Sequence, residues 1–379
     1  MEARERFGRP LALQALRGEA TKSIPVALFT WGFDYTWKVA GIEPWRLACG
    51  DTETWRGAYR ALVGRHQPDL VFYEGMGSGD SPPSLLDEDG DQWVVLDGNT
   101  GVRYGLNKHS LALFSLDTRR KTCDPLDPIQ CRRDADRLIA EFTTWGQTYL
   151  DGLRWFVEEA GDRALVLPHH SPAYICACYA FGFERAMDLM LTDPALFHYV
   201  CQRHQAGEAL RMKEWKAAGA EAVFIADSWA SCDVVSREMV REFALPYQRS
   251  ITEAAHAAGL KIILWNEGNV LPILADEAGI PVDAFAFEQS RKGISQTVAD
   301  VRAVFGPSRC LWGNLDSEHL LLRGTSAEIE DAVRSQIAES GPSSPFILST
   351  GSPLPSNVEP EAVDIMIASA RNFERGITE

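Results

Sequence analysis

A short apolar run that stops abruptly at polar residues is the strongest chemical signal in the chain. The segment Lys261–Glu267 has the sequence KIILWNE, so Glu267 directly follows a stretch long enough for one buried strand. A carboxylate in this place is costly unless it is paired, solvated or bound to a cation. Glu267 is therefore the first candidate for a general acid or base, or for a metal ligand.

Polar side chains follow the other apolar runs in the same way. If these runs are parallel strands whose carboxyl ends meet at one mouth, the polar residues surround a common pocket. Four carboxylates are predicted to be catalytic: Glu74, Asp227, Glu267 and Glu288. The residues predicted to bind substrate are Trp31, Asp34, His169, His170, Trp265, Asn266, Asn314 and Asp316.

Structural roles compete with several of these assignments. Asp227 can equally cap or position the loop that follows its strand. For Asn314 and Asp316, Asx-type hydrogen bonds in a turn are the better explanation. The neighbours His169 and His170 point to opposite sides of a strand, so at most one of them faces the pocket.

Eight apolar runs, most of them separated by helical patterns, indicate an α/β fold of the (β/α)8 TIM-barrel type. An open doubly wound sheet would need fewer strands and a glycine-rich first turn, which the sequence lacks. The helical pattern over Ser236–Gly259 has Ser236 as its N-cap, and Pro246 is expected to kink or divide it. The predicted strands are Ser23–Thr30, Asp69–Gly75, Ala164–His170, Ala222–Ser228, Lys261–Glu267, Ala284–Gln289, Cys310–Asp316 and Pro345–Gly351.

One interval, between the second and third predicted strands, departs from this alternation. Residues Asp91–Asp117 predict a β-hairpin that turns at Asp97-Gly98, and a helical stretch follows from about Cys131 to Gly161. We interpret residues 91–161 as an insertion on the barrel rim within a single domain of residues 1–379. The preceding segment, Gly75–Ser84, is rich in turn-forming residues and is interpreted as a loop over the mouth.

The amino-acid composition and net charge limit the classes of partner that the protein is expected to bind. The net charge of -16 over 379 residues argues against nucleic acid and anionic membrane surfaces. The first residues, MEARERFGRP, lack the apolar core of a signal peptide, and no apolar run is long enough to span a membrane. The eight cysteines form no dense framework, and the closest pair, Cys176-x-Cys178, is spaced more tightly than in most structural zinc sites. A cytoplasmic protein with a small-molecule substrate is expected.

A series of short motifs runs from the middle to the end of the chain: Asp193-Pro194, Ala218-Gly219-Ala220, Ala226-Asp227-Ser228, Pro246-Tyr247, Gly268-Asn269, Trp312-Gly313-Asn314-Leu315-Asp316, Gly324-Thr325 and Ile347-Leu348-Ser349-Thr350-Gly351. Their order resembles that of the uroporphyrinogen decarboxylase superfamily, and most of all its branch of corrinoid- and coenzyme M-linked methyltransferases. The similarity covers roughly residues 160–375, and it implies a (β/α)8 barrel with its pocket at the C-terminal mouth.

Two departures from the family pattern change the expected chemistry. Uroporphyrinogen decarboxylases carry an arginine-rich motif after the first strand, whereas TWGFDYTWKVAG here has Lys38 as its only cation. The methyltransferases hold zinc with His-x-Cys and a later cysteine, and the matching positions here are Trp265, Glu267 and Ser352. A divalent metal, such as zinc, would then need oxygen and nitrogen ligands, for which Glu267 and His170 are the candidates.

The leading hypothesis is methyl transfer from a small O- or N-methylated substrate to a corrinoid, carried by a corrinoid protein, or to tetrahydrofolate. Aromatic residues near the mouth would accept a methoxyaryl or methylammonium group. One alternative is a decarboxylase or related lyase acting on a small carboxylated or aromatic substrate. Another is a non-catalytic barrel that binds a partner, and a homodimer is left open.

Overall fold

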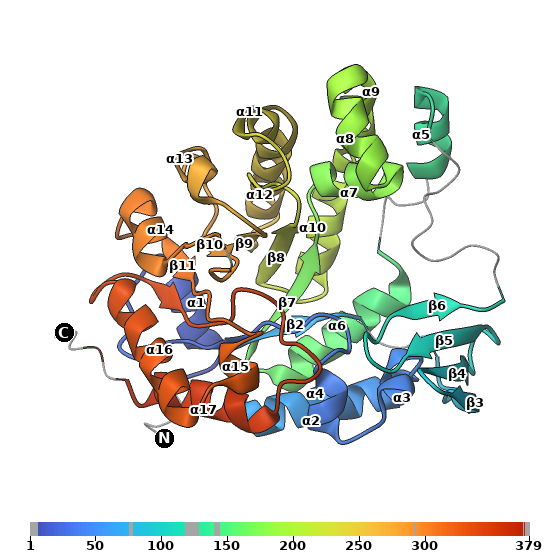
Figure 1. Cartoon of the computed structure of the whole chain (residues 1–379), viewed down its shortest axis with the longest axis horizontal. Coiled ribbons are helices and arrows are strands. Elements are labelled where there is room, and N and C mark those ends of the chain that lie inside the picture. Colours follow the sequence, from blue (N-terminus) through green and yellow to red (C-terminus); the bar gives the residue numbers. More distant parts are fainter. Residues whose placement is uncertain are drawn as a thin grey trace.

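The computed structural model describes residues 7–75, 79–117, 129–139, 145–291, 293–373 and 375. Eight parallel strands follow one another around a barrel, and a parallel bridge between Val26 and Leu348 joins the last strand to the first. The predicted (β/α)8 barrel and its eight strands are confirmed (Figure 1). The strands are β1 (Ala27–Leu28), β2 (Leu70–Tyr73), β7 (Leu165–His170), β8 (Ala222–Asp227), β9 (Lys261–Asn266), β10 (Ala284–Phe287), β11 (Cys310–Trp312) and β12 (Phe346–Ile347).

Alternate residues of each strand face the barrel interior, where aromatic side chains pack among small and aliphatic ones. Phe29 stacks on Phe72 with ring centroids 5.2 Å apart, and Trp265 meets Phe29 edge-on at 5.4 Å. The residues between them along the strands, such as Leu264, pack instead against the surrounding helices. Because both faces are buried, the strands have the continuous apolar sequences typical of a parallel sheet. This alternation also fixes which polar residues at the strand ends can reach the mouth.

The N-terminal end of the barrel is closed by α1 (Arg9–Leu16). Its residues Ala12, Ala15 and Leu16 are buried in the same cluster as the inward-facing strand residues. Small side chains on this face allow the helix to approach the strands closely. A functional site is therefore expected at the opposite end, where the strands terminate in polar residues.

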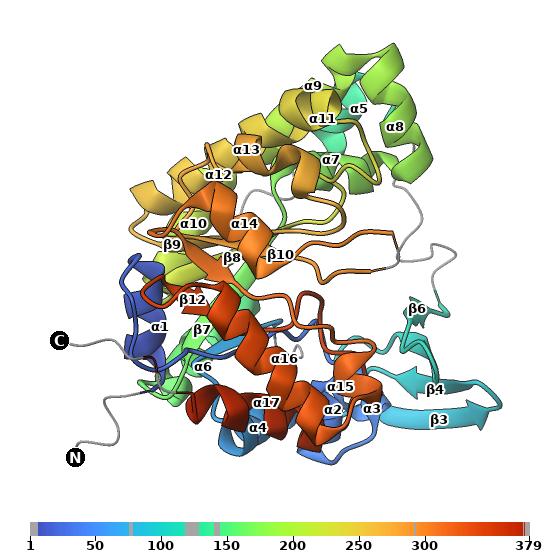
Figure 2. The same ribbon diagram turned by 60° about the vertical axis from the view of Figure 1, so that its left-hand side comes forward.

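The other helices form the outer layer and the extensions above the mouth (Figure 2). In the described part of the chain, no helix has the length and apolar character that a membrane crossing requires. The helices are α2 (Thr36–Ala40), α3 (Pro44–Ala48), α4 (Thr52–His66), α5 (Arg132–Ile139), α6 (Gln147–Ala160), α7 (Ala173–Phe181), α8 (Phe183–Thr192), α9 (Pro194–Gln205), α10 (Glu208–Ala217), α11 (Arg237–Met239), α12 (Leu245–Ala257), α13 (Leu274–Glu277), α14 (Val298–Phe305), α15 (Leu320–Arg323), α16 (Ser326–Glu339) and α17 (Pro360–Arg371), with a 3-10 turn at Leu271–Ile273.

The predicted helix over Ser236–Gly259 is confirmed and shows how Pro246 is accommodated. The Ser236 hydroxyl accepts a hydrogen bond from the Met239 backbone N–H at 3.2 Å, as expected of an N-cap. A π-helical turn, Val240–Ala244, then separates α11 from α12, so Pro246 falls in the first turn of α12. A proline is tolerated there because its missing N–H needs no partner within the helix.

The region of the rim insertion contains more β structure than the sequence predicts, and its sheet begins before the predicted residue 91. Four antiparallel strands form a second sheet, β3 (Ser84–Asp89), β4 (Gln92–Leu96), β5 (Arg103–Asn107) and β6 (Leu113–Ser115), which projects from the barrel (Figure 2). The β4–β5 hairpin is confirmed, but its loop is longer than the predicted Asp97-Gly98 turn. The loop spans residues 97–102. The Asp97 side chain stabilises it, because Oδ1 accepts hydrogen bonds from Asn99 N and Thr100 N. Residues 76–78 of the predicted mouth loop lie outside the described residues.

The helical part of the insertion is also divided. α5 and α6 both lie within the predicted helical stretch from Cys131 to Gly161, but residues 140–144 between them are not described. α6 packs its apolar face, including Leu153 and Phe156, into the main core. The insertion therefore combines an outer sheet with a helix that is part of the barrel's helical layer.

Candidate active site at the strand ends

Glu74 and His169 form an ion pair on the inner side of the barrel mouth. Each lies two residues beyond an inward-facing residue, Phe72 and Leu167, and so faces the same side. His169 Nε2 is 2.7 Å from Glu74 Oε2, and the Trp31 ring lies 4.7 Å from the His169 ring. Burial lowers the pKa of His169, but the charge and hydrogen bond of Glu74 outweigh it, so the pKa is raised overall.

Asp34 belongs to the same part of the mouth. Burial, and secondarily the negative charge of Glu74, raise the pKa of the Asp34 carboxyl to about 6. Trp31, which precedes it on the same loop, packs on His169 and on Phe29 of the interior. The structure thus brings four predicted site residues together in one acidic and aromatic group.

Glu267 and Glu288 form a second acidic group at the ends of β9 and β10. Both lie two residues beyond inward-facing residues, Trp265 and Ala286, which are cross-strand partners. Burial raises the pKa of Glu267 to about 7, with a further contribution from the charge of Glu288. Burial likewise raises the pKa of Glu288. The Glu267 carboxyl, beside a second acid in the mouth, can therefore hold and release a proton near neutral pH.

The surroundings hold Glu288 more firmly than Glu267. Glu288 Oε2 accepts a hydrogen bond from Gly268 N at 2.7 Å, and Arg291 lies 3.3 Å from the same carboxylate. Arg291 is also paired with Asp233 at 2.5 Å. Glu267 is only partly buried, with the Ser228 hydroxyl as its hydrogen-bonding neighbour. Glu267 is therefore the freer acid of the two.

Position 268 requires a glycine. Its φ is +80°, and a Cβ atom there would lie 2.3 Å from Asp233 Oδ1 and 2.5 Å from Ser231 Oγ. Any side chain would therefore displace the loop that supplies the N–H to Glu288.

The expectation that His170, Asp227 and Asn266 face the mouth is wrong. These residues occupy the outward-facing positions of β7, β8 and β9. The His170 ring meets Trp145 and Trp215 edge-on at 5.4 and 6.3 Å. Burial, followed by the charge of Arg211, lowers the pKa of His170 to about 3. It has the surroundings of a neutral structural histidine.

Three other predicted substrate-binding residues are engaged in local structure. Trp265 is buried, and its Nε1 donates to the Gly351 carbonyl at 2.9 Å. The Asn314 amide donates to the carbonyls of Glu288 and Gln296, at 3.2 and 3.1 Å. Asp316 accepts hydrogen bonds from the backbone of Glu318 and His319, both at 2.8 Å, which is the Asx-type role considered as its alternative.

The side chains at the mouth do not fit the expected metal sites. His170 faces the helical layer, so it is not placed with Glu267. Ser352 Oγ donates to Glu288 at 3.3 Å, and the Trp265 Nε1 donates to Gly351, so of the three positions that match the family's zinc ligands only Glu267 offers one here. Among the residues that the structure describes, no group of three or more His, Cys, Asp or Glu side chains is arranged to hold a metal ion.

Arg291 and Asp233 are site residues that the sequence analysis missed. Asp233 lies in the loop after β8, and Arg291 follows Glu288 by three residues. Arg291 and Glu288 are three residues apart but do not lie on a helix, so their contact, like that of Arg291 with Asp233, depends on how the loops fold together.

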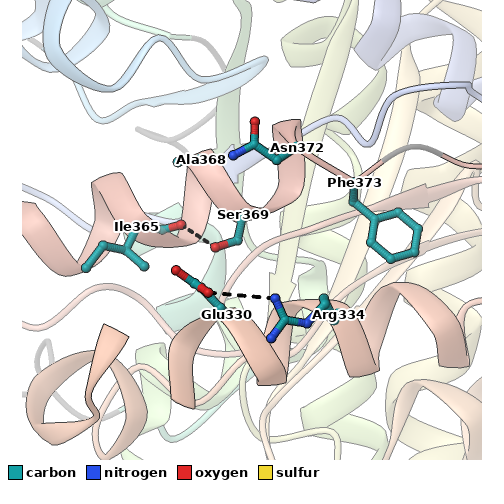
Figure 3. Close-up of a pocket in the computed structure, with 7 residues that line it drawn as sticks. All are labelled: Glu330, Arg334, Ile365, Ala368, Ser369, Asn372 and Phe373. Atoms are coloured by element: carbon teal, nitrogen blue, oxygen red, sulfur yellow. Dashed lines mark hydrogen bonds and ion pairs between the residues drawn. The ribbon is translucent and has the colours of Figure 1, made fainter. Parts of the chain in front are cut away.

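The described residues also line cavities that lie outside the mouth. One of about 260 Å³ lies between α16 and α17, where Figure 3 shows Glu330 and Arg334 on one helix facing Ile365 and Ser369 on the other. A second of about 280 Å³ includes Arg9 and Glu221 at the end of the barrel that α1 covers. Neither contains a residue predicted to be functional.

The sequence matches a known protein family over most of the barrel. Residues 126–373, more than half of the chain, match the family model described as "Uroporphyrinogen decarboxylase (URO-D)". The chain belongs to the uroporphyrinogen decarboxylase family. The resemblance noted in the sequence is thus confirmed at the level of the family.

Individual relatives carry the same family name. The chain is 28% identical over 222 residues to the uroporphyrinogen decarboxylase of Chlorobaculum tepidum, covering 56% of this chain and 61% of the relative. It is 28% identical over 148 residues to that of Anaeromyxobacter dehalogenans, covering 38% and 42%. In both cases, the matched region spans less than two thirds of the relative.

Solved structures extend the similarity of fold to nearly the whole chain. A methyltransferase from Methanosarcina mazei has a TM-score of 0.70 at 17% identity, and the match covers 96% of this chain and 98% of the other. A B12-independent methionine synthase from Shewanella sp. W3-18-1 has a TM-score of 0.52 at 8% identity, covering 92% and 96%. At these identities, the likeness concerns the fold.

Proposed function

We propose that this member of the uroporphyrinogen decarboxylase family is a methyltransferase that moves a methyl group from a small O- or N-methylated substrate to a corrinoid or tetrahydrofolate acceptor. Glu267 is assigned as the proton donor. The observation that carries the proposal is the position of Glu267 at the mouth, partly buried beside Glu288 and with a pKa of about 7. Such a carboxyl is partly protonated at neutral pH and can act as a general acid.

The proposed step follows from this arrangement. The bond between the methyl carbon and the leaving oxygen or nitrogen breaks, and its electron pair stays on the leaving atom. The Glu267 proton passes to that atom, while the methyl carbon bonds to the nucleophilic centre of the acceptor. Glu267 is left as a carboxylate, which Arg291 and Ser228 stabilise because both lower its pKa.

The charge of the mouth favours a methylated substrate over one with many carboxylates. Asp34, Glu74, Glu267 and Glu288 contribute acidic groups, whereas Lys38 is engaged with Glu359 at 2.9 Å. A substrate with several carboxylates would meet repulsion here, while Trp31 provides an aromatic face for a methoxyaryl or methylammonium group. This is why methyl transfer takes precedence over decarboxylation of a porphyrinogen.

A carboxy-lyase is the second candidate, because the family model and the named relatives are uroporphyrinogen decarboxylases. In that case, the same carboxyls would protonate the carbon from which carbon dioxide departs. A smaller substrate, with a single carboxylate near Arg291, would be compatible with the mouth.

One assay separates these candidates. The purified protein is incubated with methyl-labelled methoxyphenols and methylamines, together with reduced corrinoid or tetrahydrofolate, and label on the acceptor is measured. A parallel reaction without acceptor measures carbon dioxide released from carboxyl-labelled aromatic acids and from uroporphyrinogen. We expect acceptor-dependent label transfer that is lost in Glu267→Gln and retained in Glu330→Gln, a surface change on α16. Acceptor-independent release of carbon dioxide would favour the lyase instead.

A further inference from the structure

Four polar side chains form a buried cluster just behind the mouth, on the outer side of the barrel wall. Each comes from a different element: Asp227 from the end of β8, Asn266 from the end of β9, Gln248 from α12 and Glu277 from α13. All four are completely buried. None of them faces the proposed site, although Asp227 and Asn266 directly precede Ser228 and Glu267 in the chain.

Two hydrogen bonds define half of the contacts within this cluster. Gln248 Nε2 donates to Asp227 Oδ2 at 2.9 Å, and Asn266 Nδ2 donates to Glu277 Oε1 at 2.6 Å. The other two pairs of side chains in the cluster also lie close to each other. Asp227 and Asn266 are cross-strand partners of β8 and β9, and Gln248 lies within hydrogen-bonding reach of Glu277.

Each of the four side chains also has one buried oxygen without a hydrogen-bond partner. These atoms are Asp227 Oδ1, Gln248 Oε1, Asn266 Oδ1 and Glu277 Oε2. If both carboxyls were ionised, four acceptors and two negative charges would share a buried space, which is strongly unfavourable. If both carboxyls are protonated, each O–H can donate to one amide oxygen, and all four atoms gain a partner.

We propose that Asp227 and Glu277 are held as protonated carboxylic acids in a closed ring of hydrogen bonds with Gln248 and Asn266, and that this ring positions the strand ends that carry Ser228 and Glu267. Asp227 donates to the Asn266 oxygen, and Glu277 donates to the Gln248 oxygen. Together with the two amide donations, these bonds join β8, β9, α12 and α13. The four members of the ring are positioning residues that do not touch substrate.

The titratable groups around the ring agree with neutral acids. Burial raises the pKa of Asp227 to about 7 and that of Glu277 to about 8. Asp227 is faced by groups whose pKa burial raises, so they stay uncharged: Tyr174, Cys176, Cys178 and Tyr179 of α7, and Cys201 of α9. Glu277 is also near Asp276, whose charge is matched by Arg237 and Arg241. A second negative charge would have no matching cation among these described groups.

The test uses variants that imitate a protonated acid. In Asp227→Asn and Glu277→Gln, the new amide N–H replaces the carboxyl O–H, so the ring is kept but cannot ionise. Because folding raises both pKa values, wild-type stability falls as pH rises from about 4 through about 8. We expect the wild-type unfolding constant to rise more than about a hundredfold between about pH 6 and about pH 8.5 through these two groups, and the double variant to lose that rise.

A matched control is Asp283→Asn. Asp283 is paired with Lys261 at 2.7 Å and accepts from Ile262 N at 2.9 Å, so its amide variant, which loses the ion pair, should be less stable than wild type at neutral pH. Asp227→Ala should also be destabilised, and Asp227→Asn should restore stability. Isotope-edited infrared spectroscopy should show the C=O stretch of protonated carboxyls at about pH 6, and the double variant should lose it.

Three outcomes would overturn the ring. They are a loss of stability in Asp227→Asn at neutral pH as large as in Asp227→Ala, no protonated-carboxyl band, or a stoichiometric metal ion that the double variant fails to bind. Only the positioning role of the ring rests on the proposed function. The pH profile of methyl transfer in Asn266→Ala tests this role. The unfolding and infrared measurements need no substrate, so failure of the ring and failure of the methyltransferase assignment are distinguishable.

Discussion

The acids on the inner side of the strand ends and those on the outer side have opposite surroundings. Inside, Glu267 and Glu288 lie near Arg291 and the open mouth, so the Glu267 proton can exchange with a substrate. Outside, Asp227 and Glu277 are completely buried and bonded to amides. A shift of one residue, from Asn266 to Glu267, separates these environments. The same strand ends thus carry both the proposed chemistry and the polar cluster that fixes its position.

The largest expected effect is on the inner side. Glu267→Gln keeps the shape of the side chain but removes its proton-donating ability, so methyl-transfer turnover should fall by about 10²- to 10⁴-fold. The free energy of unfolding should change by less than about 1 kcal/mol, because the residue is only partly buried. Steady-state kinetics and urea denaturation measure the two effects. Normal turnover would remove Glu267 from its assigned role.

The next effect is on the outer side. Asn266→Ala removes the donor to Glu277 and the proposed acceptor for Asp227, and each buried group left unpaired should cost about 1–3 kcal/mol. Urea denaturation at neutral pH measures this loss, with the exposed Asn372→Ala as control at less than about 0.5 kcal/mol. Equal stability of the two variants would show that the outer cluster contributes little.

A smaller effect is expected at the Glu74–His169 pair. In Glu74→Gln, burial acts on His169 without an opposing charge, so its pKa should fall below the usual value. In wild type, the raised pKa means that the pair stabilises the fold fully below about pH 6.5, and this contribution is lost as pH rises through the folded-state pKa. Titration of the His169 ring by NMR measures the change. An unaltered titration would show that Glu74 does not control this histidine.

The smallest effect is expected at Asp316, whose backbone hydrogen bonds hold a turn. Asp316→Ala should cost about 0.5–1 kcal/mol of stability, as the loss of a capping side chain does elsewhere. Thermal unfolding measures it, and Asp316→Asn, which retains the acceptor, serves as control. A large loss of substrate affinity in both variants would instead restore the predicted binding role.

Much of the fold could be predicted because the barrel strands are continuous apolar runs. Strand β3, SLLDED, is exposed along its whole length, so neither periodicity nor apolar character marks it. The inner and outer positions could have been assigned from Trp265, since an interior residue at 265 places Glu267 inside and Asn266 outside. The part that Glu277 plays in the outer cluster could not have been predicted, because its partners come from elements that are brought together only by tertiary packing.

The most direct test of the central claim is the pH dependence of single-turnover methyl transfer in wild type and in Glu288→Gln. As a general acid with a pKa of about 7, Glu267 should give a rate that falls as pH rises through about 7. Removing the Glu288 charge should lower the pKa of Glu267 and move this fall to lower pH. A rate independent of pH, or a fall at the same pH in both proteins, would contradict the assignment of Glu267 as the proton donor.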